Sequence, residues 1–192
     1  MVETEFASAE HALWMPVYTQ PLHEFRLKDF LDSRGIPCYL PLLPEWKIQK
    51  VHSAKRSYEY RKIVWRPMFR GYLFARLTPE ERSSCWQSKS VIAFLAVPES
   101  QQEEFVRELR SVRMIEELGK DRPVEFGSEI REGELFLIES GIFEGTYGKL
   151  LKKNRQFLWT VEIECMHSTV AVEIDPSQYR MRKIGGDDGR GS

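Results

Sequence analysis

The chain has 192 residues, and its 28 basic and 29 acidic side chains give a net charge of −1. Three widely separated cysteines exclude a disulfide framework and a zinc site, and the longest apolar run, VIAFLAV, is too short to cross a bilayer. We therefore expect a cytoplasmic monomer that needs no membrane and no cofactor.

The first part of the chain predicts an α+β domain over residues 13–118, after a leader (1–12) that we expect to be disordered. LWMPVYT (13–19) is strand-like. A helix is expected over residues 21–31 and should end at SRGIP (33–37), because Gly35 accepts a left-handed conformation and Pro37 cannot continue a helix. Its apolar positions have approximately helical spacing: Leu22, Phe25, Leu27, Phe30 and Leu31.

Positive charge is concentrated between Lys47 and Arg76, where nine basic residues accompany one acid, Glu59. Residues 47–62 have few apolar anchors and are expected to form a hairpin arm or a long loop. Such a local excess suits an acidic partner, often a nucleic acid. A solvated loop balanced by acids elsewhere in the fold is the alternative.

RPMFRGYLFARL (66–77) is the strongest strand signal of this domain. In a strand, successive side chains point to opposite faces. One face would be apolar, while the face expected to meet water would combine aromatic rings with arginines. The first set is Phe69, Gly71, Leu73, Ala75 and Leu77, and the second is Met68, Arg70, Tyr72, Phe74 and Arg76.

Further along the chain, Thr78 predicts a helix start, VIAFLAV (91–97) a buried strand, and residues 99–118 a helix with one apolar side. Residues 119–126 are polar, with glycine and proline, and are expected to be a linker. Residues 127–184 contain short β-rich runs separated by glycine turns, which predicts a small all-β barrel. The tail, residues 185–192, is expected to be disordered.

Motifs in both parts of the chain occur together in an order typical of one family. The first part has the aromatic that opens LWMPVYT, Glu24 with its helix, RGIPCYLPL (34–42) and PMFRGYLF (67–74). The second has EGELFLIESGIFEGTYGKLL (132–151) and VAVEID (170–175). The chain thus resembles the NusG family of bacterial transcription elongation factors. This resemblance implies an NGN-like antiparallel sheet with flanking helices, followed by an SH3-like barrel that carries a KOW motif.

In that family an exposed aromatic patch of the first domain binds the clamp helices of RNA polymerase. Tyr72 and Phe74 are the two rings that the strand alternation also places outside, whereas Phe69 joins them only with a bulge at Gly71. The alternative is that all these rings belong to the core. Matched by position, the implied polymerase-binding residues are Tyr18, Phe69, Tyr72, Phe74 and Phe94.

The passage GIPCYLP (35–41) is similar to the specialised, RfaH-like paralogues, which suppress pausing and termination on particular long operons. In RfaH a polar face opposite the polymerase patch contacts the non-template DNA strand of the transcription bubble. The positions that match this nucleic-acid-binding face are Gln20, His23, Arg26, Ser83, Ser84 and Lys89.

The KOW domain of the family recruits Rho or a ribosomal protein, and Phe143 and Met166 match positions in that contact. KOW barrels also occur in ribosomal proteins, so a ribosome-associated RNA-binding protein is the alternative. Ten acidic residues between Glu125 and Asp175 count against it, because they repel a phosphate backbone.

An enzyme is not expected. GIFEGTYGKL (141–150) superficially suggests a phosphate-binding loop, but Phe143 stands where a glycine is needed and Leu150 where Ser or Thr would bind magnesium. The four histidines show no metal-binding spacing.

In RfaH the second domain can also rest as a helical hairpin over the polymerase-binding patch. Here FLWTVEIEC (157–165) and STVAVEID (168–175) concentrate β-branched and aromatic residues, while Gly141, Gly145 and Gly148 interrupt the most leucine-rich part of the domain within eight residues. Each glycine costs about 1 kcal/mol in a helix interior. We therefore expect the barrel form, with the patch left open.

Overall fold

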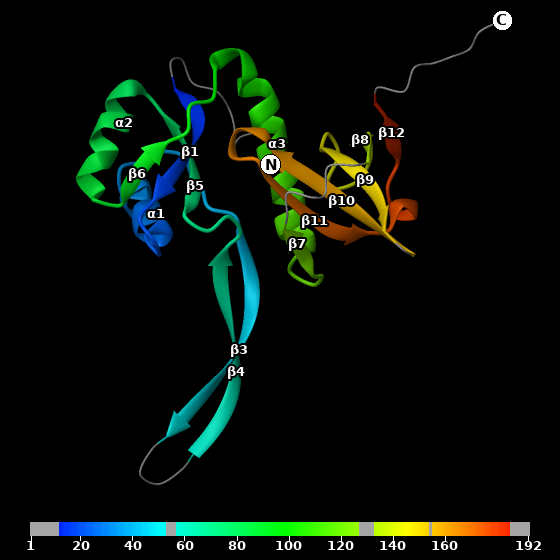
Figure 1. The fold of residues 1–192 in the computed structure, drawn as a ribbon, viewed down its shortest axis with the longest axis horizontal. Helices are drawn as coiled ribbons and strands as arrows, with labels where there is room; N and C mark the ends of the chain where they lie inside the picture. Colours follow the sequence, from blue (N-terminus) through cyan, green and yellow to red (C-terminus); the bar gives the residue numbers. More distant parts are fainter. Residues whose placement is uncertain (1–11, 53–56, 127–132, 154, 185–192) are drawn as a thin grey trace, which may run out of the picture.

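The computed structural model describes residues 12–52, 57–126, 133–153 and 155–184 (Figure 1). The expected leader, apart from Ala12, and the expected tail lie outside these ranges. The described residues form an N-terminal α+β unit, a projecting two-stranded arm and a C-terminal unit made of strands (Figure 1).

A four-stranded antiparallel sheet forms the centre of the N-terminal domain, in the order β2-β5-β1-β6. Its strands are β1 (Leu13–Thr19), β2 (Cys38–Tyr39), β5 (Tyr72–Leu77) and β6 (Val91–Phe94). Helices α1 (Glu24–Asp32) and α2 (Pro79–Cys85) pack on one face, and α3 (Gln102–Leu118) packs on the other. Two short 3₁₀ turns, η1 (Trp86–Ser88) and η2 (Glu99–Gln101), precede β6 and α3. The predicted α+β fold is confirmed.

Thr78 is the N-cap of helix α2, where the sequence predicts the start of a helix. The Thr78 hydroxyl accepts a hydrogen bond from the Glu81 N–H at 3.2 Å, and the Glu81 carboxylate accepts one from the Thr78 N–H at 2.8 Å. This reciprocal cap satisfies two backbone donors that the first turn of a helix leaves without partners.

Helix α1 begins three residues later than predicted. Leu27 and Leu31 are fully buried, but Leu22 lies before the helix with a left-handed backbone (φ 64°) and is 91% exposed. Phe25 is also exposed. Including Leu22 in the helix was therefore wrong, and the side chains of Leu22 and Phe25 are both available to a partner.

Residues 66–77 do not form one strand. Strand β4 (Ser57–Pro67) ends at Pro67, and a turn with Gly71 at φ 79° precedes β5. Strand β5 is buried on both faces: Leu73 and Ala75 pack towards α1, whereas Phe74 packs edge-on against Phe105 of α3. The prediction that Phe74 faces water was wrong, because a helix from about thirty residues downstream covers that face.

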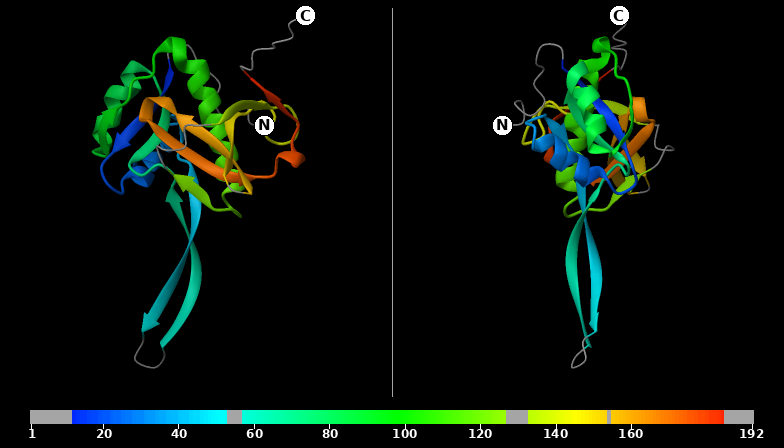
Figure 2. Two further views of the ribbon diagram at one scale, coloured as in Figure 1. Left: turned by 45° about the vertical axis from the view of Figure 1, so that its right-hand side comes forward. Right: turned by 90° about the vertical axis from the view of Figure 1, so that its left-hand side faces the viewer.

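Strands β3 (Leu42–His52) and β4 form the arm, which stands away from the body in three views (Figures 1 and 2). They pair in continuous antiparallel register from Leu42 opposite Pro67 to His52 opposite Ser57. Eleven residues per strand correspond to a length of about 35 Å. Of the two predicted conformations, the hairpin is confirmed.

The C-terminal domain is a six-stranded antiparallel sheet with the order β12-β8-β9-β10-β11-β7. Residues 124–126, expected in the linker, form its edge strand β7. An all-β domain agrees with the prediction, and the described residues show strands in place of a helical hairpin. The remaining elements are β8 (Glu134–Ile138), β9 (Tyr147–Lys153), β10 (Gln156–Ile163), η3 (Glu164–Met166), β11 (Ser168–Ile174), η4 (Pro176–Gln178) and β12 (Met181–Lys183).

Helix α3 lies between the two sheets, and a continuous apolar cluster runs from one domain into the other. The Gln102 side chain donates to the Trp14 carbonyl at 2.9 Å and accepts from the Trp14 N–H at 2.8 Å, which ties the start of α3 to β1. On the C-terminal side, the Ser111 hydroxyl accepts a hydrogen bond from the Tyr147 N–H at 3.1 Å. The helix is thus part of both cores.

Gly148 of β9 lies directly against the ring of Trp159, which is fully buried. A Cβ added at Gly148 would lie 2.3 Å from Trp159 Cε2. We expect Gly148→Ala to lower the free energy of unfolding by about 1–3 kcal/mol, the range for overpacking a core.

Urea denaturation followed by tryptophan fluorescence measures this loss. Lys152→Arg, at an exposed position of the same strand, keeps a positive charge over the Phe157 ring, so it is the matched control and should change stability by less than about 0.5 kcal/mol. Equal stability of Gly148→Ala and the unmodified protein would contradict the packing described.

Candidate functional site

The turn before β5 joins the ends of three elements beneath an exposed aromatic surface. The Gly71 N–H donates a hydrogen bond to the Glu24 carboxylate at 2.7 Å, and its carbonyl accepts one from the Thr19 N–H at 2.8 Å. Glu24 is only 4% exposed, so its carboxylate is committed to this turn. These two hydrogen bonds hold the end of β1, the start of α1 and the turn before β5 together.

A pair of stacked tyrosines lies on this turn. Tyr18 of β1 and Tyr72 of β5 are register partners, and their ring centroids are 4.9 Å apart with planes 29° from parallel. A Cβ at Gly71 would approach the Tyr18 ring to 3.0 Å, so the glycine permits both the left-handed turn and the position of the ring. Tyr18 is 37% exposed and Tyr72 is half-buried.

A hollow of about 620 Å³ lies beside Tyr18. Arg66 and Arg70 line one side of it, and the exposed Leu22 and Phe25 line another. Apolar side chains bordered by arginines suit a protein partner with an apolar anchor and acidic neighbours. The sequence predicted Leu22 and Phe25 only as apolar positions of a helix, because helical spacing does not show that the fold leaves them exposed.

Phe94 belongs to a second, smaller aromatic group on the same sheet. It is half-buried and packs edge-on against Trp86, with ring centroids 5.5 Å apart. The Arg82 guanidinium lies 5.1 Å from the centroid of the Phe94 ring. Trp86 is 51% exposed. A lone tryptophan in a polar stretch gave no periodic signal, so the sequence analysis did not select it.

The other two predicted polymerase-binding rings are core residues. Phe74 is completely buried and Phe69 is 6% exposed. The two rings pack edge to face, with centroids 5.7 Å apart. The predicted set therefore divides into an exposed or half-buried group (Tyr18, Tyr72 and Phe94) and an internal pair that supports it.

The predicted nucleic-acid-binding residues come from two segments that lie side by side. The Gln20 N–H donates to the Ser90 carbonyl at 2.8 Å, which brings the β1–α1 turn next to the Lys89 backbone. Gln20, Arg26, Ser83 and Lys89 are exposed, whereas His23 and Ser84 are half-buried. The Ser83 and Ser84 hydroxyls donate to carbonyls within α2, at 3.0 and 2.8 Å.

A family model described as transcription termination factor nusG matches residues 12–126, which is more than half of the chain. The chain belongs to the NusG family. A comparison with curated proteins found no match. NusG-family proteins are non-enzymatic transcription elongation and termination factors that bind RNA polymerase.

Two further findings concern the described part of this NusG-family protein. In the described residues, no group of three or more His, Cys, Asp or Glu side chains is placed to hold a metal ion. None of the helices found there combines the length and the apolar character needed to span a membrane.

The C-terminal domain lies against the surface formed by the tyrosine pair. A hollow of about 260 Å³ has Phe69, Arg70 and Tyr72 on one side and Met166 to Thr169 on the other. Burial raises the pKa of the Tyr72 hydroxyl, with smaller contributions from Tyr18 and Cys165. The Tyr18–Tyr72 surface is therefore partly covered by the C-terminal domain, whereas the sequence predicted an open patch.

The two predicted partner-binding residues of this domain differ in exposure. Met166 is half-buried and borders the hollow next to Tyr72. Phe143 is 8% exposed and packs against Tyr179, with ring centroids 6.0 Å apart. The neighbouring Ile142 is 81% exposed.

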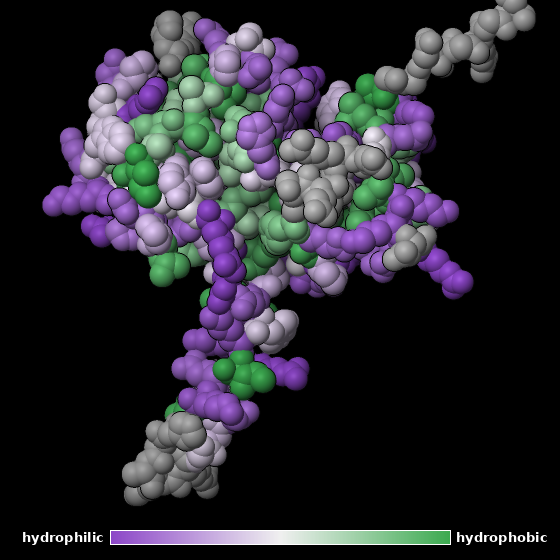
Figure 3. Space-filling model, in the orientation of Figure 1, coloured by the Kyte–Doolittle hydropathy of each residue, from purple (hydrophilic) through white to green (hydrophobic). Residues whose placement is uncertain are grey.

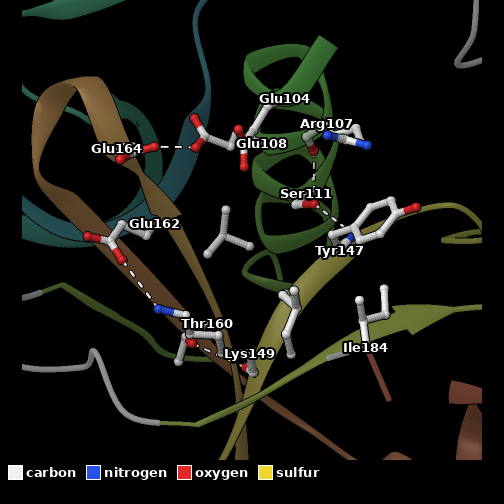
Figure 4. Close-up of a pocket in the computed structure, with 13 residues that line it drawn as sticks. Glu104, Arg107, Glu108, Ser111, Tyr147, Lys149, Thr160, Glu162, Glu164 and Ile184 are labelled. Carbon is white, nitrogen blue, oxygen red and sulfur yellow. Dashed lines mark hydrogen bonds and ion pairs between the residues drawn. The ribbon is translucent and has the colours of Figure 1, made fainter. Parts of the chain in front are cut away.

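A cavity of about 470 Å³ is lined by residues of α3 and of the C-terminal sheet (Figure 4). Glu108 of α3 points into it and accepts a hydrogen bond from the Glu164 N–H at 3.5 Å. Arg107 and Lys149 also line the cavity, and Lys149 pairs with Glu162 at 3.5 Å. Burial, reinforced by the charges of Glu104, Glu164 and Glu162, raises the pKa of Glu108 to about 8 despite the Glu164 N–H.

This raised pKa predicts that contact between the domains weakens as pH increases. With the domains apart, Glu108 should titrate near its ordinary value of 4.5; in contact, it titrates near 8. Between pH 4.5 and pH 8, docking is therefore coupled to protonation of Glu108. The free energy of docking is most favourable below pH 4.5 and becomes less favourable as pH rises to about 8.

The amide resonances of Ser111 and Tyr147, which lie on opposite sides of the contact, report docking by NMR as pH is varied. Glu108→Gln should remain docked with little pH dependence, whereas Glu103→Gln, at an exposed position of α3, should behave like the unmodified protein. A docked fraction that is constant from pH 5 to pH 8 would refute this prediction.

Proposed function

We propose that this NusG-family protein binds the clamp helices of elongating RNA polymerase through the surface of Tyr18, Tyr72 and Phe94, and suppresses pausing or termination on particular operons. This would make it a specialised, RfaH-like member that acts as a cytoplasmic monomer. The observation that carries the proposal is the stacked Tyr18–Tyr72 pair, which is partly exposed and supported from below by Gly71.

Three physical features support this surface as a protein contact. Large aromatic side chains are typical energetic anchors of interfaces. The hollow beside Tyr18 offers a pocket for an apolar group of the partner, and Arg66 and Arg70 line it. The Glu24–Gly71 hydrogen bond fixes the turn below the rings, so little ordering is required on binding.

In this proposal, Gln20, His23, Arg26, Ser83, Ser84 and Lys89 contact the non-template DNA strand. Arg26 and Lys89 provide exposed positive charge, and the two segments are adjacent through the Gln20–Ser90 hydrogen bond. Because the Ser83 and Ser84 hydroxyls are used within α2, we expect this contact to be mainly with phosphates.

The C-terminal domain, as a KOW domain, would recruit Rho or a ribosomal protein. Met166 is the accessible member of the proposed contact, since Phe143 is buried in the present arrangement. The alternative, a ribosome-associated RNA-binding protein, is disfavoured by the charges of this domain. Lys153, Arg182 and Lys183 each pair with a glutamate, which leaves less positive charge for a phosphate backbone.

The proposal predicts that Tyr18→Ala combined with Tyr72→Ala weakens binding to bacterial RNA polymerase by about thirtyfold or more. Truncating one interface anchor costs about 2 kcal/mol. The loss of the stacked pair should lower folding stability by only about 0.5–1.5 kcal/mol beyond the loss of buried area. Fluorescence anisotropy with assembled elongation complexes measures the affinity.

Phe74→Ala is the matched control, because this ring lies next to the surface but is fully buried. It should lower the free energy of unfolding by about 3–5 kcal/mol. The molecules that remain folded should bind polymerase with nearly normal affinity. Normal binding by the Tyr18/Tyr72 double variant would show that the polymerase contact lies elsewhere.

A further inference from the structure

The arm exposes several large hydrophobic side chains to solvent. Its two strands pair only with each other in the sheet topology, and the arm stands clear of the body in the space-filling view (Figure 3). Six large hydrophobic side chains on it are at least 42% exposed: Trp46, Ile48, Tyr58, Tyr60, Ile63 and Trp65. Both faces of the arm are therefore available to a partner. A ribbon of two strands is only marginally stable by itself, so a partner would also stabilise it.

The pairing register assigns these side chains to two different faces. Residues directly opposite each other share a face, so Trp46, opposite Ile63, and Ile48, opposite Arg61, lie on one side. We call this the tryptophan face. Lys47 opposite Lys62, Gln49 opposite Tyr60, and Val51 opposite Tyr58 lie on the other side, which we call the tyrosine face.

The tyrosine face carries positive charge that the protein does not neutralise. Lys47 and Lys62 are exposed and directly opposite each other, and like charges in such a pair are destabilising. Neither lysine forms an ion pair with any residue in the described ranges of the chain. The two acids of the arm are already paired, Glu59 with Lys50 at 2.8 Å and Glu45 with Arg66.

Two aromatic rings continue this face towards the tip of the arm. Tyr58 and Tyr60 follow each other along β4 with ring centroids 6.1 Å apart and planes 30° from parallel. The Tyr60 hydroxyl donates to the Gln49 side-chain oxygen at 3.1 Å, which restrains the ring. Rings 55% and 42% exposed beside two lysines combine stacking surface with positive charge.

We propose that the tyrosine face binds single-stranded nucleic acid, with unpaired bases stacked on Tyr58 and Tyr60 and phosphates held by Lys47 and Lys62. Stacking favours a single strand, because the faces of the bases in a duplex are already covered by neighbouring bases. An anion also relieves the repulsion between the two lysines. This site is separate from the polymerase surface and from the Gln20–Lys89 segments.

The test uses the full chain and fluorescein-labelled single-stranded dT15, without polymerase. Tyr58→Ala with Tyr60→Ala should weaken binding about tenfold or more, whereas Tyr58→Phe with Tyr60→Phe should retain it, because the rings remain. Lys47→Gln with Lys62→Gln should reduce the slope of log K against log salt by about 1.4, since each phosphate contact contributes about 0.7.

Trp46→Ala with Ile48→Ala, on the opposite face of the same arm, is the matched control and should change the affinity by less than twofold. A 15-base-pair duplex should bind more weakly than dT15. The proposal is overturned if the duplex binds as tightly, if the control weakens binding as much as the tyrosine variant, or if the alanine and phenylalanine variants behave alike. An unchanged dT15 affinity in the tyrosine variant, together with weaker polymerase binding, would assign this face to a protein.

Discussion

Helix α3 is buried on two sides, and this double burial determines how the two domains and the arm are placed. One side of this helix covers the N-terminal sheet through Phe105 and Leu109, and another meets the C-terminal sheet at Ser111 and Met114. The buried Glu116 carboxylate also accepts hydrogen bonds from the Tyr39 hydroxyl and the Leu42 N–H, which fixes the base of the arm. A single helix thereby positions both domains and the arm.

This arrangement explains why the candidate polymerase surface is small. By covering β5, α3 makes Phe74 a core residue, whereas Tyr18, at the end of the sheet, is 37% exposed and Tyr72 is half-buried. The same helix brings Met166 close to Tyr72. The proposed polymerase surface and the contact between the domains are therefore neighbours, and we expect the raised pKa of Glu108 to make the contact between the domains sensitive to pH.

Local signals in the sequence predicted local structure well. Three predictions depended only on neighbours within a few residues, and the structure contains each of them: the cap at Thr78, the strand LWMPVYT and the apolar spacing of α3. Errors arose where a distant segment decides the outcome. Alternation in β5 predicted one face exposed to water, but α3 covers that face. Helical spacing included Leu22 in α1, but the chain turns at Pro21 and Leu22 before the helix begins. The cross-strand register of the arm, and hence its two faces, was beyond what spacing alone can predict.

Site-specific photocrosslinking can show whether polymerase meets this protein at the proposed Tyr18–Tyr72 surface. A photoreactive phenylalanine analogue at position 18 should crosslink to a large subunit of RNA polymerase in elongation complexes. The same group at the exposed position 33, just beyond the end of α1, should give little product. Efficient crosslinking from position 33 with none from position 18 would contradict the account.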